Sequence, residues 1–274
     1  MIDLHTHTNY SDGELSPQQL IEQAKRAGIT ALGITDHDTF AGYDQARQLA
    51  SSNRLELICG IELSTSFNGR PVHLLGYFID ADPTGLRSWV SAMQNYRFER
   101  NRQLAARLQQ LGAEVTVDEA AARGRGLTGR VHFAQVLVDK GYVSSVPEAF
   151  TKFLGEAGSA YVPLLPARFS DAVRRIRAAG GVASLAHPVR VPGKIASMLP
   201  AMCDAGLNAI EAYHSDHTCD QTACYLSLAK QYSLLITGGS DFHGPSVKPG
   251  IQLGTGRQKN PIAPDDLLDR LKKR

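Results

Sequence analysis

Short apolar segments alternate with amphipathic helical segments in the first 82 residues of this 274-residue chain, and the alternation resumes at about residue 166. This pattern predicts an α/β fold in which strands are covered by helices. About seven strand–helix units favour a distorted (β/α)7 barrel over an open doubly wound sheet. The expected strands are Ile2–His5, Ala31–Thr35, Leu55–Leu63, Val72–Ile79, Val182–Ala186, Ala209–Ala212, Leu234–Gly238 and Gln252–Thr255.

The pattern changes between residues 83 and 165, where helical segments follow one another without a strong strand. A run of helices inside a strand–helix pattern predicts an inserted subdomain. We therefore expect residues 1–82 and 166–274 to form the barrel, and residues 83–165 to form a mainly helical subdomain that binds the substrate. The expected helices of this insert are Leu86–Leu111, Val131–Lys140 and Val146–Leu154.

The formal net charge is +2, from 29 basic and 27 acidic residues. A nearly neutral chain does not coat long nucleic acid by charge alone, although a local basic pocket is compatible with this balance. No run approaches the roughly 18–20 apolar residues of a membrane-spanning helix, and Met1–His5 lacks the features of a signal peptide. We therefore expect a cytoplasmic protein with no membrane contact. Its four cysteines form no CxxC pair, which indicates reduced thiols.

Histidines and carboxylates gather near the ends of the predicted strands. A lone residue of this kind is usually a cap or a hydrogen-bonded loop residue, and this alternative applies to each one taken singly. Together they would meet at one mouth of a barrel, where the strand ends converge. The residues are His5, His7, Asp12, Asp36, His37, Asp38, Glu62, His73, His187, Asp241 and His243.

Such a convergence of charged groups requires compensation. Unpaired carboxylates and imidazoles at one point would repel each other and lose solvation, and divalent cations remove that cost. Imidazole and carboxylate together form a ligand set that suits Zn, Mn or Fe. The sequence therefore predicts a metal site at the barrel mouth.

The motifs that carry these residues are Asp3-Leu4-His5-Thr6-His7, Ser11-Asp12-Gly13, Thr35-Asp36-His37-Asp38, Gly60-Ile61-Glu62, Ala186-His187-Pro188 and Ser240-Asp241-Phe242-His243. In this order, and over nearly the whole chain, they resemble the motifs of the polymerase-and-histidinol-phosphatase (PHP) family. Within that family the chain most resembles small stand-alone metal-dependent phosphoesterases. Some of these are 3′,5′-nucleotide bisphosphate phosphatases and trim short RNA from its 5′ end.

The insert also resembles this subgroup. Gly129-Arg130-Val131-His132 is similar to one of its elements, with valine in place of the usual proline. Glu156 departs from the subgroup, in which the corresponding loop often carries a basic residue.

The resemblance implies two or three divalent cations, with Mn favoured and Fe or Zn as alternatives. It assigns one cation to His5, His7, Glu62 and Asp241, a second to the bridging Glu62 with His73 and His187, and a third to Asp12, His37 and His243. Asp12 stands where some relatives have histidine, and an oxygen ligand there favours Mn or Fe over Zn. Asp36 and Asp38 would orient ligating imidazoles.

Phosphate ester hydrolysis at such a site needs no Ser–His–Asp or Cys–His arrangement. A water that bridges two cations about 3.5–4 Å apart ionises near neutral pH, and the hydroxide attacks phosphorus in line while the cations hold the phosphoryl oxygens. His217 or a metal-bound water would protonate the leaving group, and we expect His214 to have a structural role. The residues with a predicted catalytic role are Asp12, His37, Glu62, Asp241 and His217.

A 5′-phosphate on the substrate would need a separate cationic pocket. Arg130 and His132 are the candidates, with Lys140 as a further one, because arginine suits bidentate phosphate contacts. The alternatives are a surface arginine that caps a helix and a half-buried helical histidine. The stretch Tyr96–Arg102 could stack bases, but a solvated helix face is the simpler interpretation.

These features predict a metal-dependent phosphoesterase that hydrolyses the 3′-phosphate of nucleoside 3′,5′-bisphosphates, with short 5′-phosphorylated RNA as a further substrate. One alternative is a histidinol-phosphate phosphatase, whose substrate needs no base-binding subdomain. Another is a non-catalytic metal-binding module of a polymerase assembly, which need not keep every ligand position filled. The expected partner is a small phosphorylated nucleotide or short oligonucleotide, and no protein partner is inferred.

Overall fold

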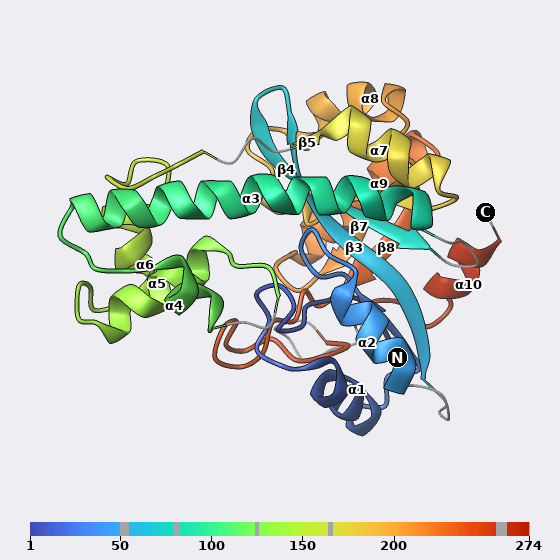
Figure 1. The fold of residues 1–274 in the computed structure, drawn as a ribbon. Coiled ribbons are helices and arrows are strands. Elements are labelled where there is room, and N and C mark those ends of the chain that lie inside the picture. The colour runs from blue at the N-terminus through green and yellow to red at the C-terminus, as the bar shows by residue number, and fades with distance from the viewer. Residues whose placement is uncertain (50–54, 79–82, 124–125, 164–166, 256–261, 274) are drawn as a thin grey trace.

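The computed structural model describes residues 1–49, 55–78, 83–123, 126–163, 167–255 and 262–273. In these ranges a barrel and a lateral group of helices lie side by side, joined by one long helix (Figure 1). No helix in the described ranges combines the length and the apolar character that crossing a membrane requires.

Seven strands form a nearly closed barrel in the described part of the chain. In spatial order they are β1 (Ile2–Thr6), β2 (Ala31–Ile34), β3 (Glu56–Phe67), β4 (Arg70–Phe78), β6 (Val182–Leu185), β7 (Ala209–His214) and β8 (Leu235–Gly239), and the short β5 (Ala167–Arg168) pairs with β3. The first and last strands approach each other at their carboxyl ends, where the Asp241 amide donates to the His5 carbonyl at 2.8 Å. The predicted α/β barrel is confirmed.

Strand β4 is the source of the distortion. It runs antiparallel to both neighbours, whereas the other strands of the barrel path pair in parallel. Asn68 and Gly69 connect β3 to β4, with φ of 50° and 76°. A two-residue turn with two positive φ values joins antiparallel strands, because a parallel connection needs a long crossover.

The prediction of a last strand at Gln252–Thr255 is wrong. This segment is a turn with one isolated antiparallel bridge between Gln252 and Thr255. Four residues that fold back on themselves leave no extended edge with which β8 or β1 could pair.

Helices cover the outside of the barrel. Helix α1 begins as the sequence predicts, with Ser16 as its cap and Pro17 in its first turn, and Gly28 follows its end with φ of 72°. The helices of the barrel are α1 (Pro17–Arg26), α2 (Ala41–Leu49), α7 (Phe169–Ala178), α8 (Ile195–Asp204), α9 (Cys219–Gln231) and α10 (Leu267–Lys272), with the 3-10 turn η2 at Pro188–Arg190.

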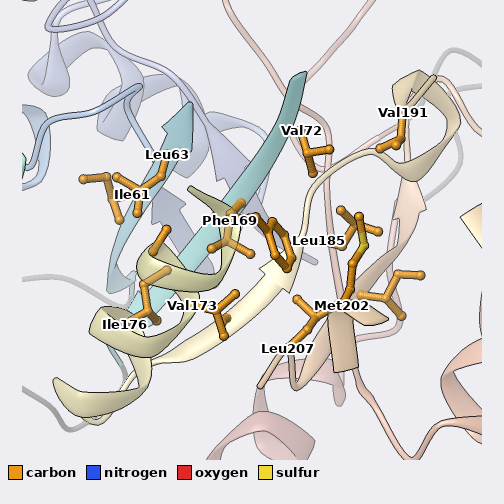
Figure 2. Close-up of a cluster of buried hydrophobic side chains, with 14 of the residues drawn as sticks. Ile61, Leu63, Val72, Phe169, Val173, Ile176, Leu185, Val191, Met202 and Leu207 are labelled. Carbon is orange, nitrogen blue, oxygen red and sulfur yellow. The ribbon is translucent and has the colours of Figure 1, made fainter. Parts of the chain in front are cut away.

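The largest core cluster lies between strands β3, β4 and β6 and helices α7 and α8. Figure 2 shows Phe169, Val173 and Ile176 of α7 directed at Ile61 of β3 and Leu185 of β6. These side chains are fully or almost fully buried. This packing fixes the strands whose carboxyl ends carry the polar residues discussed below.

A second cluster belongs to the inserted helices. Leu104, Leu108, Phe133 and Phe153 pack together in a core that contains no barrel residue. The helices of the insert are α3 (Thr84–Gln110), α4 (Val117–Ala121), α5 (Arg130–Asp139), α6 (Val146–Ala149) and the π-helix η1 (Phe150–Leu154). The exact limits of the insert, 83–165, stay a prediction.

Helix α3 belongs to both cores. Leu86 and Val90 near its start lie in the barrel cluster, whereas Leu104 and Leu108 lie in the cluster of the insert. This 27-residue helix therefore links the two packing units (Figure 1).

Replacing Phe169 by alanine should lower the free energy of unfolding by about 3–5 kcal/mol, because a fully buried aromatic ring leaves a cavity in a packed core. Phe169 is 1% exposed and lies 5.3 Å from the Phe67 ring, centroid to centroid. Urea unfolding measures the change. Phe98, which is 57% exposed on α3, gives the matched control, and Phe98→Ala should change stability little. Equal losses for both variants would contradict this account of the core.

Candidate metal centre

Four side chains from β1, β3 and the segments that follow β1 and β8 converge at the barrel mouth. The Nε2 atoms of His5 and His7 lie 3.2 Å apart, and both lie within 3.2 Å of Glu62 Oε2. Asp241 Oδ1 lies 3.3 Å from His7 Nε2 and 3.5 Å from His5 Nε2. Ligands about 2.0–2.2 Å from one cation are themselves separated by about 3–3.5 Å. The four buried atoms are therefore spaced as the ligands of a single ion would be.

The second oxygen of Glu62 faces a different pair of histidines. Glu62 Oε1 lies 2.9 Å from His73 Nδ1 and 2.8 Å from His187 Nε2. His37 Nδ1 approaches the first oxygen at 3.4 Å. Because its two oxygens face separate groups of imidazoles, Glu62 is placed to join two cation sites.

Asp12 forms a third group with His37 and His243. His243 Nε2 lies 3.3 Å from Asp12 Oδ1, and His37 Nε2 lies 3.8 Å from Asp12 Oδ2. The rings of His7 and His243 stack, with centroids 4.0 Å apart. The structure thus brings together every residue for which the sequence predicts a metal contact, although each assignment to a particular ion stays a prediction.

The backbone is strained where it presents these side chains. Asp38, His187 and Asp241 have φ of 51°, 24° and 54°, in a region that residues with a side chain rarely adopt. Such strain of about 1–3 kcal/mol per residue persists where the surrounding fold imposes it, often at functional sites. Gly239 allows the close approach of β8 to β1, since a Cβ there would lie 2.3 Å from the His5 amide nitrogen.

Hydrogen bonds fix the orientation of the central imidazole. Glu211 Oε1 lies 2.8 Å from His5 Nδ1, so that the other ring nitrogen points to the cluster. Glu211 Oε2 accepts from the His187 amide at 2.6 Å. A carboxylate behind a ligating histidine fixes its tautomer and raises its basicity.

The two acidic residues predicted for this orienting role act differently. Asp36 accepts from the Thr8 amide and from the hydroxyls of Thr8 and Ser11, each at 2.7 Å. Asp38 accepts from the Ser64 amide and from the Arg97 guanidinium. Neither carboxylate therefore has a hydrogen bond with an imidazole: Asp36 holds the loop that follows β1, and Asp38 joins β3 to α3.

The imidazoles of the cluster differ in how readily they take up a proton. Burial opposes charge on His7, but hydrogen bonds with Asp241 and Glu62 outweigh it and raise its pKa to about 10. Burial lowers the pKa of His37 and of His187 to about 4, which leaves these imidazoles neutral near pH 7. The carboxylates thus favour positive charge at the centre of the cluster, and a bound divalent cation would supply such charge.

Orphaned buried atoms also fit a metal. Among the described residues, Asp12 Oδ1 and His37 Nδ1 are buried without a hydrogen-bond partner, and their neighbours His243 Nε2 and Glu62 Oε2 lie only at ion-pair distances of 3.3 Å and 3.4 Å. Buried polar atoms are normally satisfied, and a missing ion is one reason for an exception. The donor set and these unsatisfied atoms therefore fit divalent cations.

Two residues at the cluster were not predicted to take part. His214, expected to be structural, ends β7 with its Nε2 3.3 Å from Asp241 Oδ2, and Glu211 lies inside the same strand. The predicted strand Ala209–Ala212 stopped before His214, which hid its place at a strand end. The sequence signal that could have identified Glu211 is its position as the one acidic residue in the predicted strand Ala209–Ala212.

His217 lies next to the cluster but outside the groups of potential ligands in the described residues. Its Nδ1 donates to the Ala212 carbonyl at 3.0 Å, and its Nε2 is buried without a partner. Burial lowers its pKa to about 4. A neutral ring with a free lone pair accepts a proton more readily than it donates one.

A cavity of about 510 Å³ opens from the cluster toward the insert. Asp12, His37 and His73 line one side of it. Its remaining wall includes Arg97, Arg100, Arg130, Phe150, Glu156 and Tyr161.

The three predicted substrate contacts lie in different places. Arg130 lines this cavity. His132 is buried, accepts from the Gly129 amide at 3.0 Å, and lines a separate cavity on the other side of Asp12. Lys140 lies at the end of α5, where it pairs with Glu119, and lines neither cavity.

The PHP domain family matches residues 3–148, which include His5, His37 and Glu62. The chain belongs to the PHP domain family. This PHP protein is 36% identical to a 5′-3′ exoribonuclease from Haemophilus influenzae, over 89% of its own length and 90% of that protein. It is 35% identical to a phosphoribosyl 1,2-cyclic phosphate 1,2-diphosphodiesterase from Eggerthella lenta, over 88% of its own length and 94% of that protein. It is 33% identical to a 3′,5′-nucleoside bisphosphate phosphatase from Chromobacterium violaceum, over 95% of its own length and 93% of that protein.

A solved structure gives the same result for the fold. An amidohydrolase from Chromobacterium violaceum, with bound sulfate and no metal, matches 99% of this chain and 96% of its own, at 31% identity and a TM-score of 0.85. The predicted family and the nearly closed, amidohydrolase-like barrel are therefore confirmed. The chain is a PHP phosphoesterase with buried His/Asp/Glu clusters that indicate metal sites.

Replacing Asp241 by asparagine should reduce the metal content of the purified PHP protein and abolish phosphoester hydrolysis, because the amide removes a charged oxygen from the cluster. Elemental analysis of the purified protein measures bound metal independently of turnover. Asp171→Asn on the exposed face of α7 is the control and should leave metal content unchanged. Wild-type metal content in Asp241→Asn would remove Asp241 from the predicted ligand set.

Proposed function

We propose that this PHP phosphoesterase removes the 3′-phosphate of nucleoside 3′,5′-bisphosphates, with the aid of two or three divalent cations, and also acts on short 5′-phosphorylated RNA. The observation that carries the proposal is the cavity that connects the histidine–carboxylate cluster to Arg97, Arg100 and Arg130. A substrate with two phosphates can place one at each end of such a cavity.

The ligand assignment follows the geometry of the cluster. His5, His7 and Asp241 would hold one cation with Glu62, and His73 and His187 would hold a second on the other Glu62 oxygen. Asp12, His37 and His243 would hold a third. When bound, the cations would supply an ionised water and neutralise the phosphoryl oxygens. Mn is the proposed metal, with Fe as the alternative, because Asp12 adds a carboxylate oxygen to the third group, where an oxygen ligand favours Mn or Fe over Zn.

Arg100 provides the clearest support for a second phosphate. It is 5% exposed, its Nε has no hydrogen-bond partner, and no carboxylate among the described residues pairs with it. Burial and the neighbouring charges of Arg97 and Arg130 lower its pKa to about 9. A buried guanidinium without a counter-charge is costly, and a bound phosphate would relieve this cost.

Arg130 and two aromatic rings complete this end of the cavity. Its guanidinium lies 5.8 Å and 5.6 Å from the ring centroids of Phe150 and Tyr161, and its Nη1 donates to the Leu154 carbonyl at 3.1 Å. Leu154 ends the π-helix η1, a rare geometry that often marks functional sites. Aromatic faces beside arginine suit the base of a nucleotide.

The same residues disfavour the alternatives. The substrate of a histidinol-phosphate phosphatase carries an ammonium group next to its single phosphate. Arg100 and Arg130 in the wall would repel this group, whereas Arg97 is paired with Asp38. A non-catalytic metal-binding module has no need of a phosphate-sized cavity beside the cluster. The bisphosphate phosphatase and exoribonuclease relatives support a nucleotide substrate, whereas the cyclic phosphodiesterase relative shows that similarity alone does not select one.

Replacing Arg130 by alanine or Arg100 by glutamine should raise KM for a nucleoside 3′,5′-bisphosphate by about 10- to 100-fold, the range expected for a lost charged hydrogen bond. The KM for p-nitrophenyl phosphate, which lacks a second phosphate, should change little. Steady-state kinetics with both substrates measure the difference. Arg102→Ala is the matched control, since Arg102 is 64% exposed on the same helix as Arg100. Equal effects on both substrates would contradict a phosphate-binding role.

Removing divalent cations with a strong chelator should abolish turnover of p-nitrophenyl phosphate and lower Tm, because a ligand that binds only the folded state stabilises it. Adding Mn back should restore both quantities. Calorimetry and a colorimetric assay measure them separately. Full activity of the chelated, metal-free protein would contradict the metal-dependent mechanism.

A further inference from the structure

A second group of charged side chains, Arg190, Asp216 and Lys248, lies at the cluster but outside the arginine cavity. Arg190 follows β6 in the turn η2, Asp216 follows β7, and Lys248 lies in the loop after β8. The arginine cavity instead lies beside β3, β4 and the insert, and none of these three residues lines it. In the strand order of the barrel, β7 and β8 are separated from β3 by β4 and β6.

Arg190 and Lys248 contact Asp241 Oδ2, whereas the other oxygen of Asp241 faces His5 and His7. Lys248 Nζ lies 2.6 Å and Arg190 Nη1 2.9 Å from Asp241 Oδ2, and His214 Nε2 approaches the same atom at 3.3 Å. Asp216 Oδ2 accepts a hydrogen bond from Arg190 Nε at 3.1 Å. The same oxygen lies 3.9 Å from Lys248 Nζ.

Asp241 Oδ2 has more donors than it can satisfy well. A carboxylate oxygen offers about two lone-pair sites, and three donors face this one. Its hold on them weakens further when Asp241 Oδ1 shares its charge with a divalent cation. Arg190 is the donor that can turn away, because its side chain is 40% exposed whereas Lys248 is 16% exposed and His214 is buried.

We propose that Arg190, backed by Lys248, binds the phosphate that follows the scissile bond in a short oligoribonucleotide. This inference rests on the proposed function and deepens it by naming a subsite for the RNA substrate. The first nucleotide occupies the cavity with its 5′-phosphate at Arg100 and Arg130. The scissile phosphate lies at the cluster, and the downstream chain leaves over the ends of β7 and β8.

The same bond breaks in both substrates. Water attacks phosphorus, the P–O3′ bond of the first nucleotide breaks, and O3′ takes up a proton. The phosphoryl group keeps the 5′-oxygen of the downstream nucleotide, or is released as phosphate when the substrate is a bisphosphate. Only a substrate of three or more nucleotides has a further phosphate that can reach Arg190. Oligonucleotide length is therefore the variable that isolates this subsite.

The decisive experiment compares kcat/KM for three substrates of the metal-loaded protein: a nucleoside 3′,5′-bisphosphate, a 5′-phosphorylated dinucleotide and a 5′-phosphorylated trinucleotide. Arg190→Gln should lower the trinucleotide-to-dinucleotide ratio by about 10-fold, as for one lost charged hydrogen bond. Arg190→Lys, which keeps the charge, should recover part of this ratio. Arg174→Gln removes an arginine that is 71% exposed on α7 and should leave the ratio unchanged.

A binding measurement gives a readout that does not depend on turnover. Fluorescence anisotropy of the metal-loaded protein uses a 5′-phosphorylated, 3′-labelled hexanucleotide whose first linkage has a methylene group in place of the 3′-oxygen and cannot be hydrolysed. It yields the slope of log affinity against log salt. Arg190→Gln should reduce this slope by about 0.7, the contribution of one phosphate contact in a single strand.

Two results would overturn the inference. Equal losses on all three substrates would show that Arg190 acts only through Asp241, and an unchanged length ratio with an unchanged salt slope would show that it meets no phosphate. Failure of the unaltered protein to hydrolyse the bisphosphate would contradict the proposed function instead. In that event the salt slope would still support or overturn a phosphate contact at Arg190.

Discussion

The convergence of buried carboxylates and imidazoles on Glu62 is the constraint on which the rest of the barrel mouth depends. Each oxygen of this carboxylate faces separate histidine nitrogens at about 3 Å. His5, His7 and Asp241 beside it are buried, whereas Asp12 and His73 at the edge of the cluster are partly exposed. Such an arrangement is unfavourable in a protein without compensating positive charge. The strained turns at Asp38, His187 and Asp241 show that the fold maintains the arrangement at a cost in backbone energy.

The barrel and most of the cluster could be predicted from the sequence, for identifiable reasons. Strands with apolar runs and polar ends are local patterns, and the ends of parallel strands meet at a common face whatever the details of packing. The antiparallel direction of β4 was not predicted, because an apolar run carries no sign of its direction. The short Asn68-Gly69 connection was the only local sign of it.

The contacts that depend on tertiary neighbours were the ones that sequence reasoning missed. Arg100 lies on a helix whose pattern of charges resembled a solvated face, yet it is buried near Arg130 and Tyr161, which are distant in sequence. His132 and Lys140 looked like phosphate ligands beside Arg130, but they lie on other faces of α5 and contact Gly129 and Glu119. A helix of ten residues turns nearly three times, so neighbours in sequence need not share a site.

Helix α3 gives the molecule a mechanical property that neither packing unit has alone. Its first half is embedded in the barrel, its second half carries the core of the insert, and between them Arg97 contacts Asp38 beside His37. The helix thus acts as a rigid spacer that sets how far the arginines stand from the histidine cluster. Under the proposed function, this helix would set the span between two phosphates that a substrate has to match.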